Sequence, residues 1–137
     1  MGCPVRILDS SYLIAFFLEE DFHHVKAIDR AETDSQSAES WIIPDPILFE
    51  SLSVIRYDQG APAARKALER LMSNQNIQIY QFNSRERTAI FELFFSSSYS
   101  ISAADATVAY LCKQMRAPAL TYDENLLKVI AQQTLSP

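Results

Sequence analysis

The chain has 137 residues, of which 48% are hydrophobic and 21% are charged. We expect residues 1–137 to form one globular domain, because a chain of this length can bury roughly two thirds of its unfolded surface. Its apolar runs are too short to span a bilayer, and its two cysteines lack the spacing of a zinc site or a disulfide framework. We therefore expect a cytoplasmic protein without membrane association and with reduced thiols.

The formal net charge is −5, from 12 basic and 17 acidic residues. This balance argues against nucleic-acid binding through bulk electrostatics, because polyanions are held chiefly by Lys and Arg. Four of the acids, however, lie inside apolar segments. Without them 12 basic residues face 13 acidic ones, a net charge of −1, so the acidic balance weakens a nucleic-acid function without excluding it.

The first part of the chain alternates between an apolar strand and helical patterns. Val5–Leu8 is expected to be a buried strand, and either Ser10 or Ser11 can cap the helix that follows. A second helix is expected from about Phe22. The polar stretch Thr33–Ser40 then has the composition of a loop.

The middle of the chain carries clear helix boundaries. Trp41–Ile43 is the next expected strand, after which Asp45 is a candidate N-cap and Pro46 a candidate first helical residue. Gly60 is well placed to end that helix. Another helix is expected over Ala63–Met72.

The remaining pattern adds two strands, Ile77–Phe82 and Pro118–Thr121, and three helices, Ser84–Phe95, Ala103–Met115 and Glu124–Gln132. Strands that alternate with helices are typical of an α/β protein. The chain has only two glycines and no hairpin dipeptide. We therefore predict a central parallel sheet of about four to five strands with helices on both faces.

Asp9, Glu50, Asp105 and Asp123 are the four acids that interrupt apolar segments. Burial of an unpaired charge is costly, so a carboxylate among core-forming residues must be paired, hydrogen-bonded or bound to a metal. The sequence places no matching set of basic residues beside them. A shared cation is therefore indicated, and oxygen-only ligands favour Mg²⁺ or Mn²⁺ over zinc.

Each of these acids also has a simpler structural explanation. Asp9 and Asp123 follow strands, at the sheet edge where open α/β proteins bind ligands, but either residue could be a helix N-cap. Glu50 shares a helix face with apolar residues, or lies at the edge of that face. Asp105 and Ser102 match a capping box, although Asp105 also shares a face with apolar residues.

The four acidic segments together resemble the successive motifs of the PIN domain family, in order and in separation. The segments are Ile7–Ala15, Pro46–Leu52, Ser102–Ala106 and Leu120–Asp123. The resemblance covers nearly the whole chain and is greatest to small single-domain PIN proteins of the VapC toxin type. It implies a metal-dependent endoribonuclease that cleaves RNA, the toxin of a type II pair, held in check by a cognate antitoxin protein.

The resemblance also implies roles for individual residues. The catalytic ligands of Mg²⁺ or Mn²⁺ would be Asp9, Glu50, Asp105 and Asp123, with supporting hydroxyls from Ser10 and Thr121. Asn125 stands where the family often has a further acid, and its side chain could hold a metal-bound water. The final edge strand that is usual in the family is not evident near the end of the chain.

Two other functions fit parts of the pattern. A metal-dependent phosphatase of the haloacid dehalogenase kind also has an Asp after an apolar strand, but it needs a second Asp two residues later, where this chain has Ser11. A PIN-like scaffold that is inactive and acts by partner binding is the other alternative. Four retained acids argue against a scaffold, because carboxylates about 4 Å apart repel by about 4 kcal/mol per pair at an effective dielectric near 20.

Other prominent residues are expected to have mainly structural roles. Neighbouring His23 and His24 would point about 100° apart on a helix and would not easily share a metal. Four basic residues could contact RNA phosphates, although such side chains are more often merely solvated: Arg85, Arg87, Lys113 and Arg116.

Three aromatic residues mark the junction of the first two predicted helices: Phe16, Phe17 and Phe22. Core packing is their first explanation, and an antitoxin-binding groove is the alternative. We also expect a homodimer, in which this aromatic region is buried against a partner helix.

Overall fold

Four parallel strands form the centre of the molecule. The computed structural model describes residues 4–36 and 39–135. Its sheet contains β1 (Val5–Leu8), β2 (Ser40–Pro44), β3 (Ile77–Tyr80) and β4 (Ala119–Leu120), in the order β3-β2-β1-β4. Every neighbouring pair is parallel. The carboxyl ends of all four strands therefore lie at one edge of the sheet.

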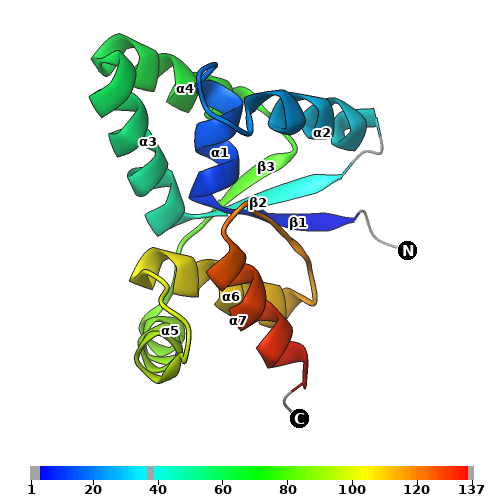
Figure 1. Cartoon of the computed structure of the whole chain (residues 1–137), viewed down its shortest axis with the longest axis vertical. Helices are drawn as coiled ribbons and strands as arrows, with labels where there is room; N and C mark the ends of the chain where they lie inside the picture. The colour runs from blue at the N-terminus through cyan, green and yellow to red at the C-terminus, as the bar shows by residue number, and fades with distance from the viewer. Residues whose placement is uncertain (1–3, 37–38, 136–137) are drawn as a thin grey trace.

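Helices cover both faces of this sheet, as predicted (Figure 1). The helices on one side are α1 (Ser10–Phe17), α2 (His24–Gln36), α3 (Asp45–Gln59) and α4 (Ala61–Ser73). Those on the other side are α5 (Ser84–Ser96), α6 (Ala103–Met115) and α7 (Glu124–Leu135). None of the helices in the described part of the chain is long and apolar enough to cross a membrane.

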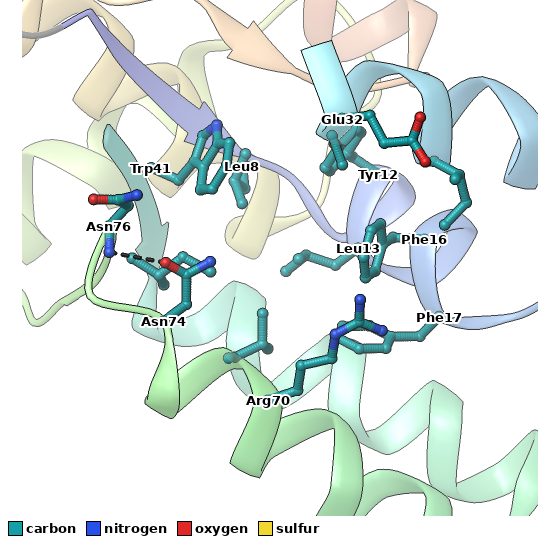
Figure 2. Close-up of a pocket in the computed structure, with 14 residues that line it drawn as sticks. Leu8, Tyr12, Leu13, Phe16, Phe17, Glu32, Trp41, Arg70, Asn74 and Asn76 are labelled. Atoms are coloured by element: carbon teal, nitrogen blue, oxygen red, sulfur yellow. Dashed lines mark hydrogen bonds between the residues drawn. The ribbon is translucent and has the colours of Figure 1, made fainter. Parts of the chain in front are cut away.

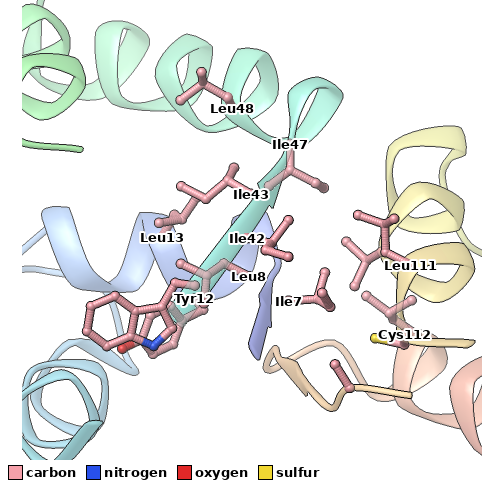
Figure 3. Packing of buried hydrophobic residues seen from close by; sticks show 14 of the residues in the cluster. Ile7, Leu8, Tyr12, Leu13, Ile42, Ile43, Ile47, Leu48, Leu111 and Cys112 are labelled. Atoms are coloured by element: carbon pink, nitrogen blue, oxygen red, sulfur yellow. The ribbon is translucent and has the colours of Figure 1, made fainter. Parts of the chain in front are cut away.

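The core fills the space on each side of β1 and β2. Successive residues of a strand point to opposite faces, so a strand covered on both faces must be apolar throughout. In Figure 3, Ile7 points toward Leu111 and Cys112 of α6, whereas Leu8 lies beside Tyr12 of α1. Burial on both sides of the sheet therefore holds the end of β1, and the residue that follows it, in a defined position.

Several predicted helix boundaries are wrong. α2 continues to Gln36, inside the segment Thr33–Ser40 that we expected to be a loop. Thr33 is exposed and its hydroxyl bonds the carbonyl of Asp29, four residues earlier. Thr33 therefore lies on a solvent-facing part of the helix, which continues to Gln36, while residues 37 and 38 of the expected loop lie outside the described residues.

The predicted N-caps of two helices are also wrong. The N-cap of α1 is Asp9, so Ser10 and Ser11 already lie inside the helix. The N-cap of α3 is Pro44, which places Asp45 at the first helical position. Gly60 ends α3 as predicted, with a φ of 93° that favours glycine. Among the described residues no strand follows α7.

Candidate metal centre

Asp9 is the most buried of the four predicted acids. It follows β1 directly, and its side chain is only 1% exposed. Oδ2 accepts hydrogen bonds from the hydroxyls of Ser11 at 2.9 Å and Thr121 at 2.6 Å. Oδ1 is buried without a hydrogen-bond partner. Asp9 is the N-cap residue of α1, yet its side chain makes no capping bond, so capping does not explain this carboxylate.

A network of hydroxyls joins Asp9 to the end of β4. The backbone N–H of Asp123 donates to Thr121 Oγ1 at 3.0 Å, and that of Tyr122 donates to Ser11 Oγ at 2.8 Å. The two hydroxyl oxygens lie 3.1 Å apart. The strand ends of β1 and β4 are thus tied together by side chains that also orient Asp9.

Ser11 is a member of this network that sequence reasoning missed. The resemblance assigned a supporting hydroxyl to the buried Ser10, whereas the hydroxyl that bonds Asp9 from this segment belongs to Ser11. The spacing of Ser11, two residues after Asp9, was the available signal, since a short side chain in the first turn of a helix can reach back to the residue before the helix.

Asp105 has both of the roles that its sequence suggested. It forms a capping box with Ser102: the N–H of Asp105 donates to Ser102 Oγ at 3.0 Å, and the N–H of Ser102 donates to Asp105 Oδ2 at 3.1 Å. Its side chain is nevertheless buried. The same carboxylate therefore caps α6 and faces the interior.

The pKa of Asp105 reflects both its burial and the charges of the other three acids. Burial raises this pKa to about 6, the Ser102 N–H opposes the rise, and the negative charges of Asp9, Asp123 and Glu50 raise it further. Like charges have this effect only over short distances. The fold therefore brings the four acids to one region at the carboxyl edge of the sheet.

Glu50 and Asp123 complete this region from α3 and from the start of α7. Glu50 is half-buried, and its Oε2 is buried without a hydrogen-bond partner. Asp123 Oδ1 accepts from the N–H of Leu126 at 3.0 Å, which is a capping bond. Capping thus accounts for one oxygen of Asp123 and for neither carboxylate oxygen of Glu50.

The carboxylate oxygens of the four acids are suitable ligands for a hard divalent cation, although the side chains do not converge on one metal position. Among the described residues, no group of three His, Cys, Asp or Glu side chains is arranged to hold a metal ion. The buried oxygens Asp9 Oδ1 and Glu50 Oε2 still lack partners. Buried acceptors of this kind normally have a donor or a cation, so the fit rests on the chemistry of the oxygens rather than on a preformed cage.

Cys112 lies on α6 close to this region. Burial raises the pKa of its thiol to about 12, and the charge of Asp9 contributes to the rise. The thiol is free and remains protonated at neutral pH. It therefore adds no soft ligand to a set of oxygens.

Asn125 lies beside the acids but faces a loop. Its Nδ2 donates to the carbonyl of Ser100 at 3.0 Å. This bond connects the start of α7 to the segment that precedes α6. The role of Asn125 toward a metal-bound water stays a prediction.

The two histidines do not share a ligand position. The ring of His23 stacks on Tyr122 at 4.2 Å between centroids, whereas His24 Nδ1 lies 2.7 Å from the carbonyl oxygen of Ala15. The basic residues Arg85, Arg87, Lys113 and Arg116 are all exposed. Lys113 lies near the end of α6, about 12 Å along the helix from Asp105 at its start.

Comparisons with known proteins agree with this architecture. Residues 6–131 match the model of the PIN domain family. No curated protein matches the chain. Three solved structures are similar to it in fold, although their sequence identities are low.

The first is the Mycobacterium tuberculosis toxin VapC20, which cleaves the sarcin-ricin loop, at 14% identity and a TM-score of 0.79, with 90% of this chain and 93% of that chain covered. The second is VapBC2 from Rickettsia felis bound to a DNA fragment from its promoter, at 12% identity and a TM-score of 0.69, with 91% and 92% covered. The third is PAE2754 from Pyrobaculum aerophilum, at 16% identity and a TM-score of 0.61, with 99% and 98% covered. Because the family model matches nearly the whole chain, this protein belongs to the PIN domain family.

Proposed function

We propose that this protein is an endoribonuclease that hydrolyses RNA phosphodiester bonds with Mg²⁺ or Mn²⁺ held by Asp9, Glu50, Asp105 and Asp123. The observation that carries the proposal is that one oxygen each of Asp9 and Glu50, Oδ1 and Oε2, is buried without a hydrogen-bond partner. A protein keeps mutually repelling carboxylates together at a cost in stability. A bound cation would remove that cost, because all four acids would be its ligands.

The chain's own residues set the geometry of this reaction. A divalent cation, when bound, supplies charge neutralisation at the phosphate and lowers the pKa of an attacking water. Ser11 and Thr121 hold one oxygen of Asp9, which leaves Oδ1 available as a ligand. Asp105 must lose its proton to act as a ligand, and its pKa of about 6 makes this possible at neutral pH.

The direct test is cleavage of a panel of single-stranded and structured RNAs with Mg²⁺ or Mn²⁺. We expect cleavage in unpaired regions, where bases are accessible, and complete loss of cleavage with EDTA. Asp9→Asn should be inactive, and Glu124→Gln, which alters an exposed acid one residue from Asp123, should be as active as wild type. Cleavage that survives exhaustive chelation would rule out the metal mechanism, and Mn²⁺ binding without cleavage of any RNA would favour the inactive scaffold.

We also propose that a cognate antitoxin covers a groove on the α1 side of the sheet. A pocket of about 340 Å³ lies between α1, α2, α4, the end of β1 and the starts of β2 and β3. Figure 2 shows Leu13, Phe16 and Phe17 lining it, with the guanidinium of Arg70 over the Phe16 ring at a distance of 4.9 Å. Apolar walls with charged groups at the rim suit an amphipathic segment of a partner protein.

Phe22 does not line this groove, but it lies in the connection between α1 and α2, whose residues do. It tests whether the partner surface extends from the groove to this connection. Phe16 and Phe17 are partly buried against the core, but Phe22 is 90% exposed. Phe22→Asp should therefore fold normally and cleave RNA, and it should resist inhibition by the cognate antitoxin. Leu127→Asp, on α7 across the sheet, is the matched control and should remain inhibited. Equal inhibition of both variants would exclude Phe22 from the interface.

A homodimer is the final part of the proposal. The sequence led us to expect the dimer at Phe16, Phe17 and Phe22, but we assign that region to the antitoxin and place the dimer surface on α5. Phe91 and Phe95 lie one turn apart on α5 and are 43% and 77% exposed. An apolar patch of this kind is typical of a surface that a second subunit covers. Light scattering should give twice the mass of one chain, and Phe95→Asp should give one chain's mass. A wild-type monomer at all concentrations would reject the dimer.

A further inference from the structure

A pocket beside the acids is not accounted for by the proposed reaction. It has a volume of about 290 Å³ and lies between α1, α2 and the segment Ala119–Tyr122. Thr121, which donates to Asp9, is part of its wall. The pocket therefore adjoins the acids through a residue that both share.

Two basic residues line this pocket. Lys26 and Arg30 are exposed side chains one turn apart on α2, so they lie on the same face of the helix. Both basic residues line the same pocket as Tyr122, which follows β4. Their charges are therefore presented to whatever occupies this pocket.

The wall opposite the two basic residues is held in place. The N–H of Tyr122 donates to Ser11 Oγ at 2.8 Å. The Tyr122 ring stacks on His23 at 4.2 Å between centroids and at an interplanar angle of 9°. Asp21 Oδ1 accepts a hydrogen bond from the N–H of His23 at 2.8 Å and thereby fixes the turn before α2.

The charge distribution makes such a site useful to a nuclease. The chain carries a net charge of −5, and carboxylates such as that of Asp9 repel an approaching phosphodiester. A strand of RNA is held mainly through Lys and Arg at its phosphates. Basic side chains close to the acids, but not among them, would hold the strand without competing for the metal.

We propose that Lys26 and Arg30 bind a backbone phosphate of the RNA strand, next to the phosphodiester that the acids cleave. The proposal rests on the proposed function, since it assigns the substrate position that flanks the reaction. Thr121 and Tyr122 form the part of the pocket wall that leads from this phosphate toward Asp9. Lys26 and Arg30 thus bind and position the RNA strand and take no part in the bond cleavage itself.

RNA binding tests the proposal separately from cleavage. Binding of a short single-stranded RNA is measured by fluorescence anisotropy over a range of salt concentrations, in the inactive Asp9→Asn background. Lys26→Gln/Arg30→Gln should weaken binding about tenfold and should reduce the slope of log affinity against log salt by about 0.7 for each phosphate that the protein no longer neutralises. In the active protein the same pair should raise KM and leave kcat unchanged.

A matched control separates a local effect from that of overall charge. Arg65→Gln/Lys66→Gln removes the same two charges from exposed positions on α4, and it should leave the affinity and the salt slope as in wild type. Lys26→Arg/Arg30→Lys keeps both charges and should restore binding. Equal weakening by the two Gln pairs, or no weakening by the Lys26 and Arg30 pair, would overturn the phosphate site. Failure of the proposed function would appear differently, as wild-type protein that cleaves no RNA.

Discussion

Thr121 shows how a single hydroxyl can support a buried carboxylate. Its hydroxyl donates to Asp9 Oδ2 at 2.6 Å and accepts from the N–H of Asp123 at 3.0 Å. Asp9 is buried, so removal of this donor leaves a carboxylate oxygen poorly satisfied.

We predict that Thr121→Val lowers the free energy of unfolding by about 1.5–3 kcal/mol, the usual range for a hydrogen bond to a charged group. Thr121→Ser keeps the hydroxyl and should be much less destabilised. Urea denaturation of both variants measures the difference. Equal destabilisation would mean that the methyl group, rather than the hydroxyl, matters at this position.

The titration of Asp105 should appear in the pH dependence of stability. Its pKa is about 6 in the folded protein and 3.8 in the absence of interactions. The folded state therefore binds the proton more tightly than the unfolded state, and stability falls as pH rises from about 4 to about 6. Solvent screening limits this fall to about 1–2 kcal/mol.

Chemical denaturation in EDTA between pH 4 and pH 7 tests this expectation. The stability of wild type relative to Asp105→Asn should decrease over that window, because Asn cannot ionise. Mn²⁺ affinity should increase over the same window, since the ligand must be deprotonated. A difference that is flat with pH would show that Asp105 titrates normally.

Two helices, α5 and α6, each begin with a capping box, so the effects of the two caps can be compared. Ser102 caps α6 with Asp105, and Asn83 caps α5 with Glu86. Only the first box contains a residue of the candidate metal centre. The two caps should therefore have similar effects on stability and different effects on metal binding.

We predict that Ser102→Ala and Asn83→Ala each lower the free energy of unfolding by about 1 kcal/mol. Only Ser102→Ala should also weaken Mn²⁺ binding, because it removes one of the bonds that position Asp105. Thermal melts and isothermal titration calorimetry give the two quantities. An unchanged Mn²⁺ affinity in Ser102→Ala would separate the cap of α6 from the metal site.

For the whole molecule, the four acids create a competition between stability and function. Two carboxylates about 4 Å apart repel each other by about 4 kcal/mol at an effective dielectric near 20. A bound cation would offset repulsion of this size. Metal binding and folding are then linked.

We predict that Asp9→Asn leaves stability in EDTA unchanged or higher, because it removes a charge that the other acids repel. Wild type, unlike Asp9→Asn, should gain from Mn²⁺, by about 2.7 kcal/mol at a hundredfold excess over the dissociation constant. Glu124→Gln is the control and should gain as wild type does. Thermal melts with and without Mn²⁺ measure these gains. If the acids were only caps, all three proteins would respond equally to Mn²⁺, and that result would reject the shared site.

The sequence by itself determined the order of strands and helices, the parallel α/β class and the four acidic segments. These features depend on local patterns: the apolar run Val5–Leu8, the Asp45-Pro46 pair at the start of α3 and the capping box at Ser102 are each readable within a few residues. The extension of α2 through Thr33 was missed because a polar, exposed helix and a loop have similar compositions.

Only the tertiary structure decided which side chains meet. Ser11 and Thr121 are 110 residues apart, and Tyr122 reaches His23 across a similar separation, so no local pattern could reveal these contacts. The pocket of Lys26 and Arg30 arises because α2 lies beside the segment Ala119–Tyr122. Local sequence specifies where an element begins and which residues it buries, whereas long-range packing determines the partners of each polar group.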